Sequence, residues 1–126
     1  MYDIAIIGAG VSGAAIARRL SSYRLDVALI ERRVDASFGV SKANSGIIHA
    51  GFHHAPSSLK ARLEVAGNRA FDALQAELGF PFRRNGIIVA AFSWEEMKVV
   101  DGLYAQGLAN GARGIEIVGR DRILAL

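Results

Sequence analysis

The feature that most constrains this chain is a glycine-rich turn placed between a short apolar strand and a helix. The turn spans residues 8–13 (GAGVSG) and directly follows the apolar run of residues 3–7. Gly8 permits a tight turn, Gly10 lets the backbone approach a pyrophosphate, and Gly13 lets the helix pack closely on the strand. The helix N-terminus offers free N–H groups and the positive end of its dipole. The turn therefore predicts a site for dinucleotide phosphates.

The residues after the turn complete the context that such a site needs. We expect a helix from Val11 to about Tyr23 and a second strand over residues 27–30, which makes a parallel βαβ unit. Glu31 ends that strand, 18 residues after Gly13, where an acid accepts hydrogen bonds from the adenosine ribose. An acid there disfavours a 2′-phosphate, so NADP is not the expected ligand. The motif itself does not distinguish FAD from NAD, and a glycine-rich turn in an unrelated α/β protein is the alternative.

The rest of the chain shows a mixture of irregular and helical patterns. Apolar residues recur three and four apart between residues 59 and 78, which predicts a helix with one face in the core. Serine at the start and Gly79 at the end suit that helix, and Ser93 with Glu96 forms a capping box. The expected elements are a functional loop over 32–56, a helix from Ser57 or Ser58 to Leu78, a strand over Gly86–Phe92, a helix from Ser93 to about Ala109, a short strand or connector over 115–118, and a helix capped by Asp121.

Composition excludes several classes of protein. The chain has 126 residues and no cysteine, so disulfides, thiolate metal sites and thiol nucleophiles are excluded, and the lack of disulfides suits the cytosol. The net charge is +3, but the basic residues are scattered, which argues against a nucleic-acid surface. No apolar run approaches the ~20 residues of a membrane span. Residues 1–3 lead straight into a strand, so no signal peptide is expected.

Three further blocks give the chain a family resemblance: residues 44–51 (NSGIIHAG), residues 56–61 (PSSLKA), and Gly67-Asn68 with residues 81–86 (PFRRNG). With the glycine turn and Glu31, these blocks resemble the DAO-type, glutathione-reductase-like superfamily of flavoproteins. The resemblance is closest to the branch of glycerol-3-phosphate dehydrogenase and L-2-hydroxyglutarate oxidase. Lys42-Ala43 and Ala91-Phe92 favour the glycerol-3-phosphate dehydrogenase group.

The resemblance implies an α/β fold in which a Rossmann-like (glutathione-reductase-type) FAD-binding βαβ unit precedes the first part of a substrate domain. Residues 1–80 would form the N-terminal part of the FAD-binding domain, and residues 81–126 would begin the substrate (cap) domain. The resembled enzymes are several times longer, so we expect an N-terminal fragment. Its unpaired sheet edges and apolar faces would favour self-association.

By the same resemblance, the cofactor is FAD and the reaction is oxidation of glycerol 3-phosphate by hydride transfer to FAD. The alternatives are oxidation of L-2-hydroxyglutarate, another 2-hydroxy acid or an amino acid, or a non-catalytic nucleotide-binding fragment. Expected partners are a small substrate that bears a phosphate or carboxylate, and an electron-acceptor subunit or a quinone. The expected location is the cytoplasm, which could include the inner face of the membrane.

The resemblance also implies site residues. His49 would lie near the reactive face of the flavin, as the base for a substrate hydroxyl or as an orienting group; the alternative is a histidine that only hydrogen-bonds the loop or the flavin. His53 and His54 follow, but no carboxylate or cysteine lies near them in sequence, so no metal site is predicted. Arg83 and Arg84 would be either an anion clamp or a solvated pair. The cofactor-binding residues would be Gly8, Gly10, Val11, Ser12, Gly13, Glu31, Arg32, Ser41, Lys42, Asn44, Ser45 and Gly46.

Overall fold

The computed structural model describes residues 1–125, which form two compact units. The first unit is Met1–Gly46, and the second begins at Ile47. The predicted division into residues 1–80 and 81–126 concerns the complete enzyme and stays a prediction. The last residue of that second part, Leu126, lies outside the described residues.

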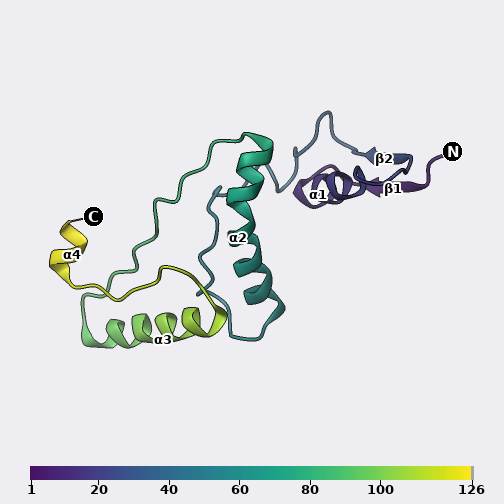
Figure 1. Ribbon diagram of the computed structural model, residues 1–126. Helices are drawn as coiled ribbons and strands as arrows, with labels where there is room; N and C mark the ends of the chain where they lie inside the picture. The colour runs from purple at the N-terminus through teal and green to yellow at the C-terminus, as the bar shows by residue number, and fades with distance from the viewer. Residues whose placement is uncertain (126) are drawn as a thin grey trace. The chain divides into compact units, whose positions relative to one another are not determined.

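The first unit is a βαβ unit, as the sequence predicts. Strand β1 (Ile4–Ile7), helix α1 (Val11–Leu20) and strand β2 (Val27–Ile30) follow one another along the chain (Figure 1). The two strands pair in parallel, with Ile4 opposite Val27. Their parallel pairing brings the carboxyl ends of both strands to the same edge, next to the glycine turn.

Helix α1 ends earlier than the sequence predicts, at Leu20 rather than near Tyr23. The hydroxyl groups of Ser21 and Ser22 donate to backbone carbonyls of the last turn at 2.7 and 2.8 Å. Such side-chain hydrogen bonds compete with the helical ladder and favour a turn instead.

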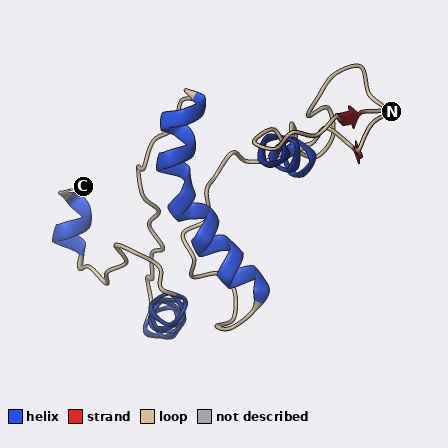
Figure 2. Ribbon diagram, turned by 45° about the vertical axis from the view of Figure 1, so that its right-hand side comes forward, coloured by secondary structure: helices blue, strands red, loops and turns tan. Residues whose placement is uncertain are grey.

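The second unit is built mainly from helices, which Figure 2 shows joined by long irregular segments. Helix α2 (Leu59–Leu78) begins at Ser58, whose Oγ accepts a hydrogen bond from the backbone N–H of Ala61 at 3.2 Å. It ends at Gly79, which has a left-handed φ of 71°. Both ends agree with the sequence prediction.

Helix α3 (Trp94–Asn110) confirms the predicted capping serine. Ser93 Oγ accepts from the backbone N–H of Glu96 at 3.1 Å, and the Glu96 carboxylate accepts from the backbone N–H of Phe92 at 2.6 Å. Helix α4 (Arg120–Leu124) has Gly119 as its N-cap, so the prediction that Asp121 caps it is wrong. Asp121 lies in the first turn, where its charge still suits the helix dipole.

The predicted strand over residues 86–92 is wrong, because this segment is irregular in the structure. A strand needs a hydrogen-bonding neighbour, and among residues 1–125 only β1 and β2 form a sheet. Ile87, Ile88 and Val89 are exposed as a result. Residues 115–118 form a connector, one of the two outcomes the sequence allows.

The buried apolar residues are few: Ile6, Ala9, Phe52, Ala61 and Val65. The prediction that the apolar stripe of α2 forms a core is therefore wrong for much of its length, since Leu59, Leu63 and Leu78 are exposed. Ile7 in β1 is also exposed, because successive side chains of a strand point to opposite faces and the buried face is that of Ile6. Among the described residues, no helix has the length and apolar character needed to cross a membrane.

Candidate functional site

The glycine turn is held by two side chains from later in the first unit. The backbone N–H of Ala9 donates to the carboxylate of Glu31 at 2.8 Å, and the backbone N–H of Val11 donates to Ser41 Oγ at 2.8 Å. An ideal Cβ on Gly10 would lie only 3.1 Å from that same Ser41 oxygen. The structure thus brings Glu31 and Ser41 to the turn, and their contact with a cofactor stays a prediction.

Glu31 is held in its ionised form. Its carboxylate accepts hydrogen bonds from the backbone N–H of Arg33 at 2.9 Å and of Ala9 at 2.8 Å. These bonds, the one from Arg33 above all, lower the pKa of Glu31 below its usual value. The carboxylate is therefore available as a charged hydrogen-bond acceptor throughout the neutral range.

These features fit the diphosphate and ribose of FAD. Gly10 is the N-cap of α1 and makes no side-chain cap, so the first turn is closed only by Ser41. A helix N-terminus with remaining free N–H groups, reached past a glycine, is the arrangement that binds phosphates in dinucleotide folds. The residues that would hold the cofactor here are the glycine turn, Ser41 and Glu31.

The other predicted cofactor residues lie around this turn or on the segment that follows it. Asn44 shapes that segment, because its amide donates to the Ser41 carbonyl at 2.7 Å and accepts from the Gly46 N–H at 2.8 Å. The Lys42 ammonium lies 3.9 Å from the centroid of the Phe38 ring. The remaining three are exposed: Ser12, Arg32 and Ser45.

His49 belongs to the second unit, where residues 47–56 form a loop that we call the histidine loop. Amide side chains of α2 and α3 donate to its backbone carbonyls: Asn68 to His49 at 2.8 Å, Gln106 to Phe52 at 2.6 Å, and Asn110 to Gly51 at 3.0 Å and to His54 at 2.8 Å. The loop has no regular structure of its own, so these amides fix its path.

The structure adds one residue that the sequence reasoning missed, Glu64 of α2. Its carboxylate oxygen Oε1 lies 3.1 Å from Nδ1 of His49 and 3.4 Å from Nδ1 of His53. The three side chains offer potential metal-ligand atoms within 4.8 Å of one another. No carboxylate lies near the histidines in the sequence, but α2 supplies one across the loop, so the prediction of no metal site loses its basis. No local spacing signals this approach, because it depends on how α2 packs on the loop.

Arg84 is a structural residue rather than a free anion clamp. Its guanidinium donates to both carboxylate oxygens of Asp72, at 2.9 and 2.7 Å, and to the Asn68 side chain at 3.0 Å. The paired guanidinium lowers the pKa of Asp72 and the carboxylate raises the pKa of Arg84. This bidentate pair ties the irregular segment after α2 back to the helix. Arg83 is exposed.

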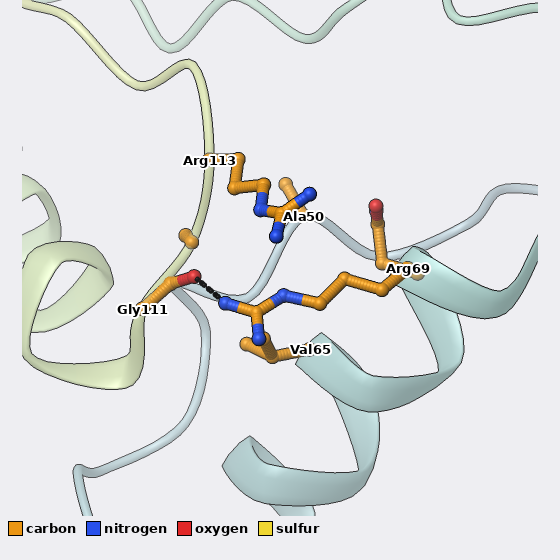
Figure 3. A pocket seen from close by; sticks show the side chains of 7 residues that line it. Ala50, Val65, Arg69, Gly111 and Arg113 are labelled. Atoms are coloured by element: carbon orange, nitrogen blue, oxygen red, sulfur yellow. Dashed lines mark hydrogen bonds between the residues drawn. The ribbon is translucent and has the colours of Figure 1, made fainter.

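A small pocket lies between α2 and the end of α3, lined in part by Arg69, Arg113 and Asn68 (Figure 3). The Arg69 guanidinium donates to the carbonyl of Gly111 at 2.8 Å, which is the dashed line in Figure 3. Gly111 ends α3 with a left-handed φ of 76°, so Arg69 satisfies a carbonyl at a helix C-terminus. The pocket is therefore part of the packing between α2 and α3.

Comparison with known proteins also indicates an FAD-dependent protein. A family model described as FAD dependent oxidoreductase (DAO) matches residues 3–126. A glycerol 3-phosphate dehydrogenase of Caloramator mitchellensis is 48% identical over 126 residues, which are 100% of this chain and 26% of that protein. Mitochondrial L-2-hydroxyglutarate dehydrogenases are also similar. The Caenorhabditis briggsae protein is 37% identical over 97% of this chain and 29% of its own length, and the human protein is 32% identical over 97% and 27%.

Proposed function

Since the chain belongs to the DAO family of FAD-dependent oxidoreductases, we propose that it is the FAD-binding segment of an enzyme that oxidises glycerol 3-phosphate. The chain spans between a quarter and a third of the length of the curated relatives it matches. The single observation that carries the cofactor part is the glycine turn, with Glu31 and Ser41 hydrogen-bonded to it. The substrate part rests on the 48% identity to a glycerol 3-phosphate dehydrogenase.

Each part of the glycine turn binds a different part of the cofactor. The backbone N–H groups of Gly10, Ser12 and Gly13 bind the diphosphate, because the other N–H groups of the turn already donate within the first unit. Ser41 closes the helix N-terminus beside it, and Glu31 accepts the ribose hydroxyls. FAD, when bound, supplies the acceptor for the hydride. The proposed partner that would take the electrons is an acceptor subunit or a quinone.

Direct binding tests the cofactor assignment. We expect the purified chain to bind FAD, seen as a shift in flavin absorption and quenching of flavin fluorescence. Glu31→Gln should weaken binding by roughly 10- to 100-fold, because a charge-assisted hydrogen bond contributes about 1.5–3 kcal/mol.

Asp35→Asn is the matched control for this test. Asp35 is an exposed carboxylate in the same segment, and it accepts only from the adjacent backbone N–H of Ala36. Its replacement should leave FAD affinity within about twofold of the wild type, which is small on the scale of hydrogen-bond energies. Equal affinity of Glu31→Gln and wild type would contradict the ribose assignment.

The substrate assignment needs the rest of the enzyme. We would replace the matching segment of the Caloramator mitchellensis enzyme with these 126 residues, and measure anaerobic flavin reduction. Reduction by glycerol 3-phosphate rather than L-2-hydroxyglutarate supports the proposal. The second substrate is the specific alternative, because the L-2-hydroxyglutarate dehydrogenase of Caenorhabditis briggsae matches 97% of this chain.

We propose His49 as the group that acts on the substrate hydroxyl, either as its base or by orienting it. The His49 side chain is 59% exposed, so a substrate can reach it. In the chimera, His49→Ala should slow flavin reduction by roughly 100-fold, the lower range of general acid–base contributions. His54→Ala is the control on the same loop and should leave the rate unchanged. A normal rate in His49→Ala would end the proposed role.

A further inference from the structure

The Glu64 carboxylate is buried with no hydrogen-bond donor among the described residues. Its side chain is only 7% exposed, and neither of its oxygens has a hydrogen-bond partner within the described chain. The nearby imidazoles of His49 and His53 approach to ion-pair distance but do not meet hydrogen-bond geometry. Removing a carboxylate from water without compensation costs several kcal/mol. This burial therefore points to a cation at the cluster.

The two distances from Glu64 to the imidazoles match the spacing of ligands in a metal site. When zinc binds nitrogen and oxygen ligands tetrahedrally at 2.0–2.1 Å, adjacent ligand atoms lie about 3.3–3.4 Å apart. The two imidazole nitrogens lie 3.1 and 3.4 Å from Oε1 of Glu64, and all three ligand groups lie within 4.8 Å of one another. Two imidazoles and one carboxylate also form a ligand set that zinc uses when it keeps a fourth position open.

The surrounding structure holds these ligands in place before any ion binds. The carbonyl of His49 is tied to α2 by Asn68, and the carbonyl of Phe52 is tied to α3 by Gln106. The His53 ring stacks on the Phe52 ring with centroids 4.2 Å apart, and Phe52 is buried. A backbone fixed in this way reduces the entropy cost of bringing the ligands together.

We propose that His49, His53 and Glu64 bind a divalent transition-metal ion of the zinc class. Imidazole nitrogen favours zinc, cobalt or nickel, whereas magnesium and calcium require mainly oxygen ligands. The site lies wholly in the second unit, so it goes beyond the proposed function and needs neither FAD nor substrate.

The site also bears on the two roles proposed for His49. A metal ion on Nδ1 leaves the proton on the other ring nitrogen, which then donates a hydrogen bond. The metal-bound form of His49 is therefore an orienting group and not a base.

Metal binding to the chain tests the proposal without FAD. After chelator treatment, the chain would be titrated with Co²⁺, followed by visible absorption, and with Zn²⁺ and Mg²⁺, followed by calorimetry. We expect one Co²⁺ or Zn²⁺ per chain and no binding of Mg²⁺. Glu64→Gln and His53→Asn should each weaken Zn²⁺ binding by roughly 100-fold, since even indirect partners contribute 10–100-fold. His54→Asn, one residue along the same loop, should bind as the wild type.

Histidine NMR on the wild-type chain keeps the test decisive if a variant does not fold. Zn²⁺ should shift the imidazole resonances of His49 and His53 and leave those of His54 in place. Absence of Zn²⁺ binding, unchanged affinity in Glu64→Gln, or equal shifts at all three histidines would overturn the proposal. FAD binding by the same sample is a separate measurement, so failure of the metal site does not affect the proposed function.

Discussion

Replacing Gly13 with alanine is expected to destabilise the first unit strongly and to weaken FAD binding. An ideal Cβ at Gly13 would overlap the carbonyl oxygen of Gly8 and lie 3.1 Å from its carbonyl carbon. Both atoms belong to the backbone of the turn, so no side-chain rotation can relieve the overlap. The turn itself is fixed by the hydrogen bond from Gly8 N–H to the carbonyl of Ile30 at 2.7 Å.

The expected loss of stability in Gly13→Ala is large because the overlapping atoms belong to the backbone. Overpacking a well-filled site costs about 1–3 kcal/mol and sometimes more, and a rigid backbone neighbour places Gly13→Ala at or above the upper end. That corresponds to a fall in melting temperature of roughly 10 °C or more. The measurement is thermal unfolding by circular dichroism, together with the FAD titration.

Gly39→Ala is the matched control for Gly13→Ala. Gly39 lies in the same unit, has no neighbour within 4 Å of an added Cβ, and does not have a positive φ. It should unfold at the wild-type temperature and bind FAD equally well. If Gly13→Ala behaved like this control, close packing of α1 on the turn could not be the reason for the third glycine of the motif.

The sequence predicts the first unit well because each of its determinants is local. The apolar residues of β1, the glycine turn and Glu31 act within about thirty residues, and the carboxylate needs only the end of β2 to reach Ala9. The cluster of His49, His53 and Glu64 could not be predicted in this way. It forms only when α2 places the carboxylate of Glu64, which belongs to no sequence motif, against a loop that precedes the helix.

The wrong prediction of a strand over residues 86–92 arises because a local pattern is present but its neighbour is absent among residues 1–125. Its apolar pattern suits a strand, but a strand exists only where a neighbour accepts and donates its backbone hydrogen bonds. Here Arg84 binds Asp72 and Asn68, and Phe82 lies with its ring centroid 5.7 Å from that of Phe71, so the start of the segment follows α2 instead. The apolar pattern of residues 86–92 is therefore real, but it does not show that a neighbouring strand is present.

Gly51 of the histidine loop is the second position at which a single methyl group should have a large effect. Its φ is +105°, a conformation that side chains rarely adopt, and an added Cβ would lie 2.7 Å from Cγ2 of the buried Val65. Backbone strain and overlap each cost about 1–3 kcal/mol. We expect Gly51→Ala to destabilise the second unit by about 3 kcal/mol, measured by urea unfolding followed at the helical circular dichroism signal.

Gly67→Ala, in the same unit, is expected to raise the stability rather than lower it. Gly67 lies inside α2 with nothing within 4 Å of an added Cβ, so alanine should stabilise the helix by up to about 1 kcal/mol. A loss of stability in Gly67→Ala would show that α2 is not formed as described. A gain there with a large loss in Gly51→Ala separates a helix propensity effect from a packing effect.

A double-mutant cycle then divides the Gly51→Ala effect into its two causes. Val65→Ala removes the overlapping methyl and alone should cost about 2 kcal/mol of buried apolar surface. If overlap with Val65 matters, Gly51→Ala combined with Val65→Ala should be at least about 1 kcal/mol more stable than the sum of the single effects. Additive effects would instead assign the loss to backbone strain. In either case the histidine loop needs glycine at position 51, where the backbone φ is positive and Val65 of α2 leaves no room for a Cβ.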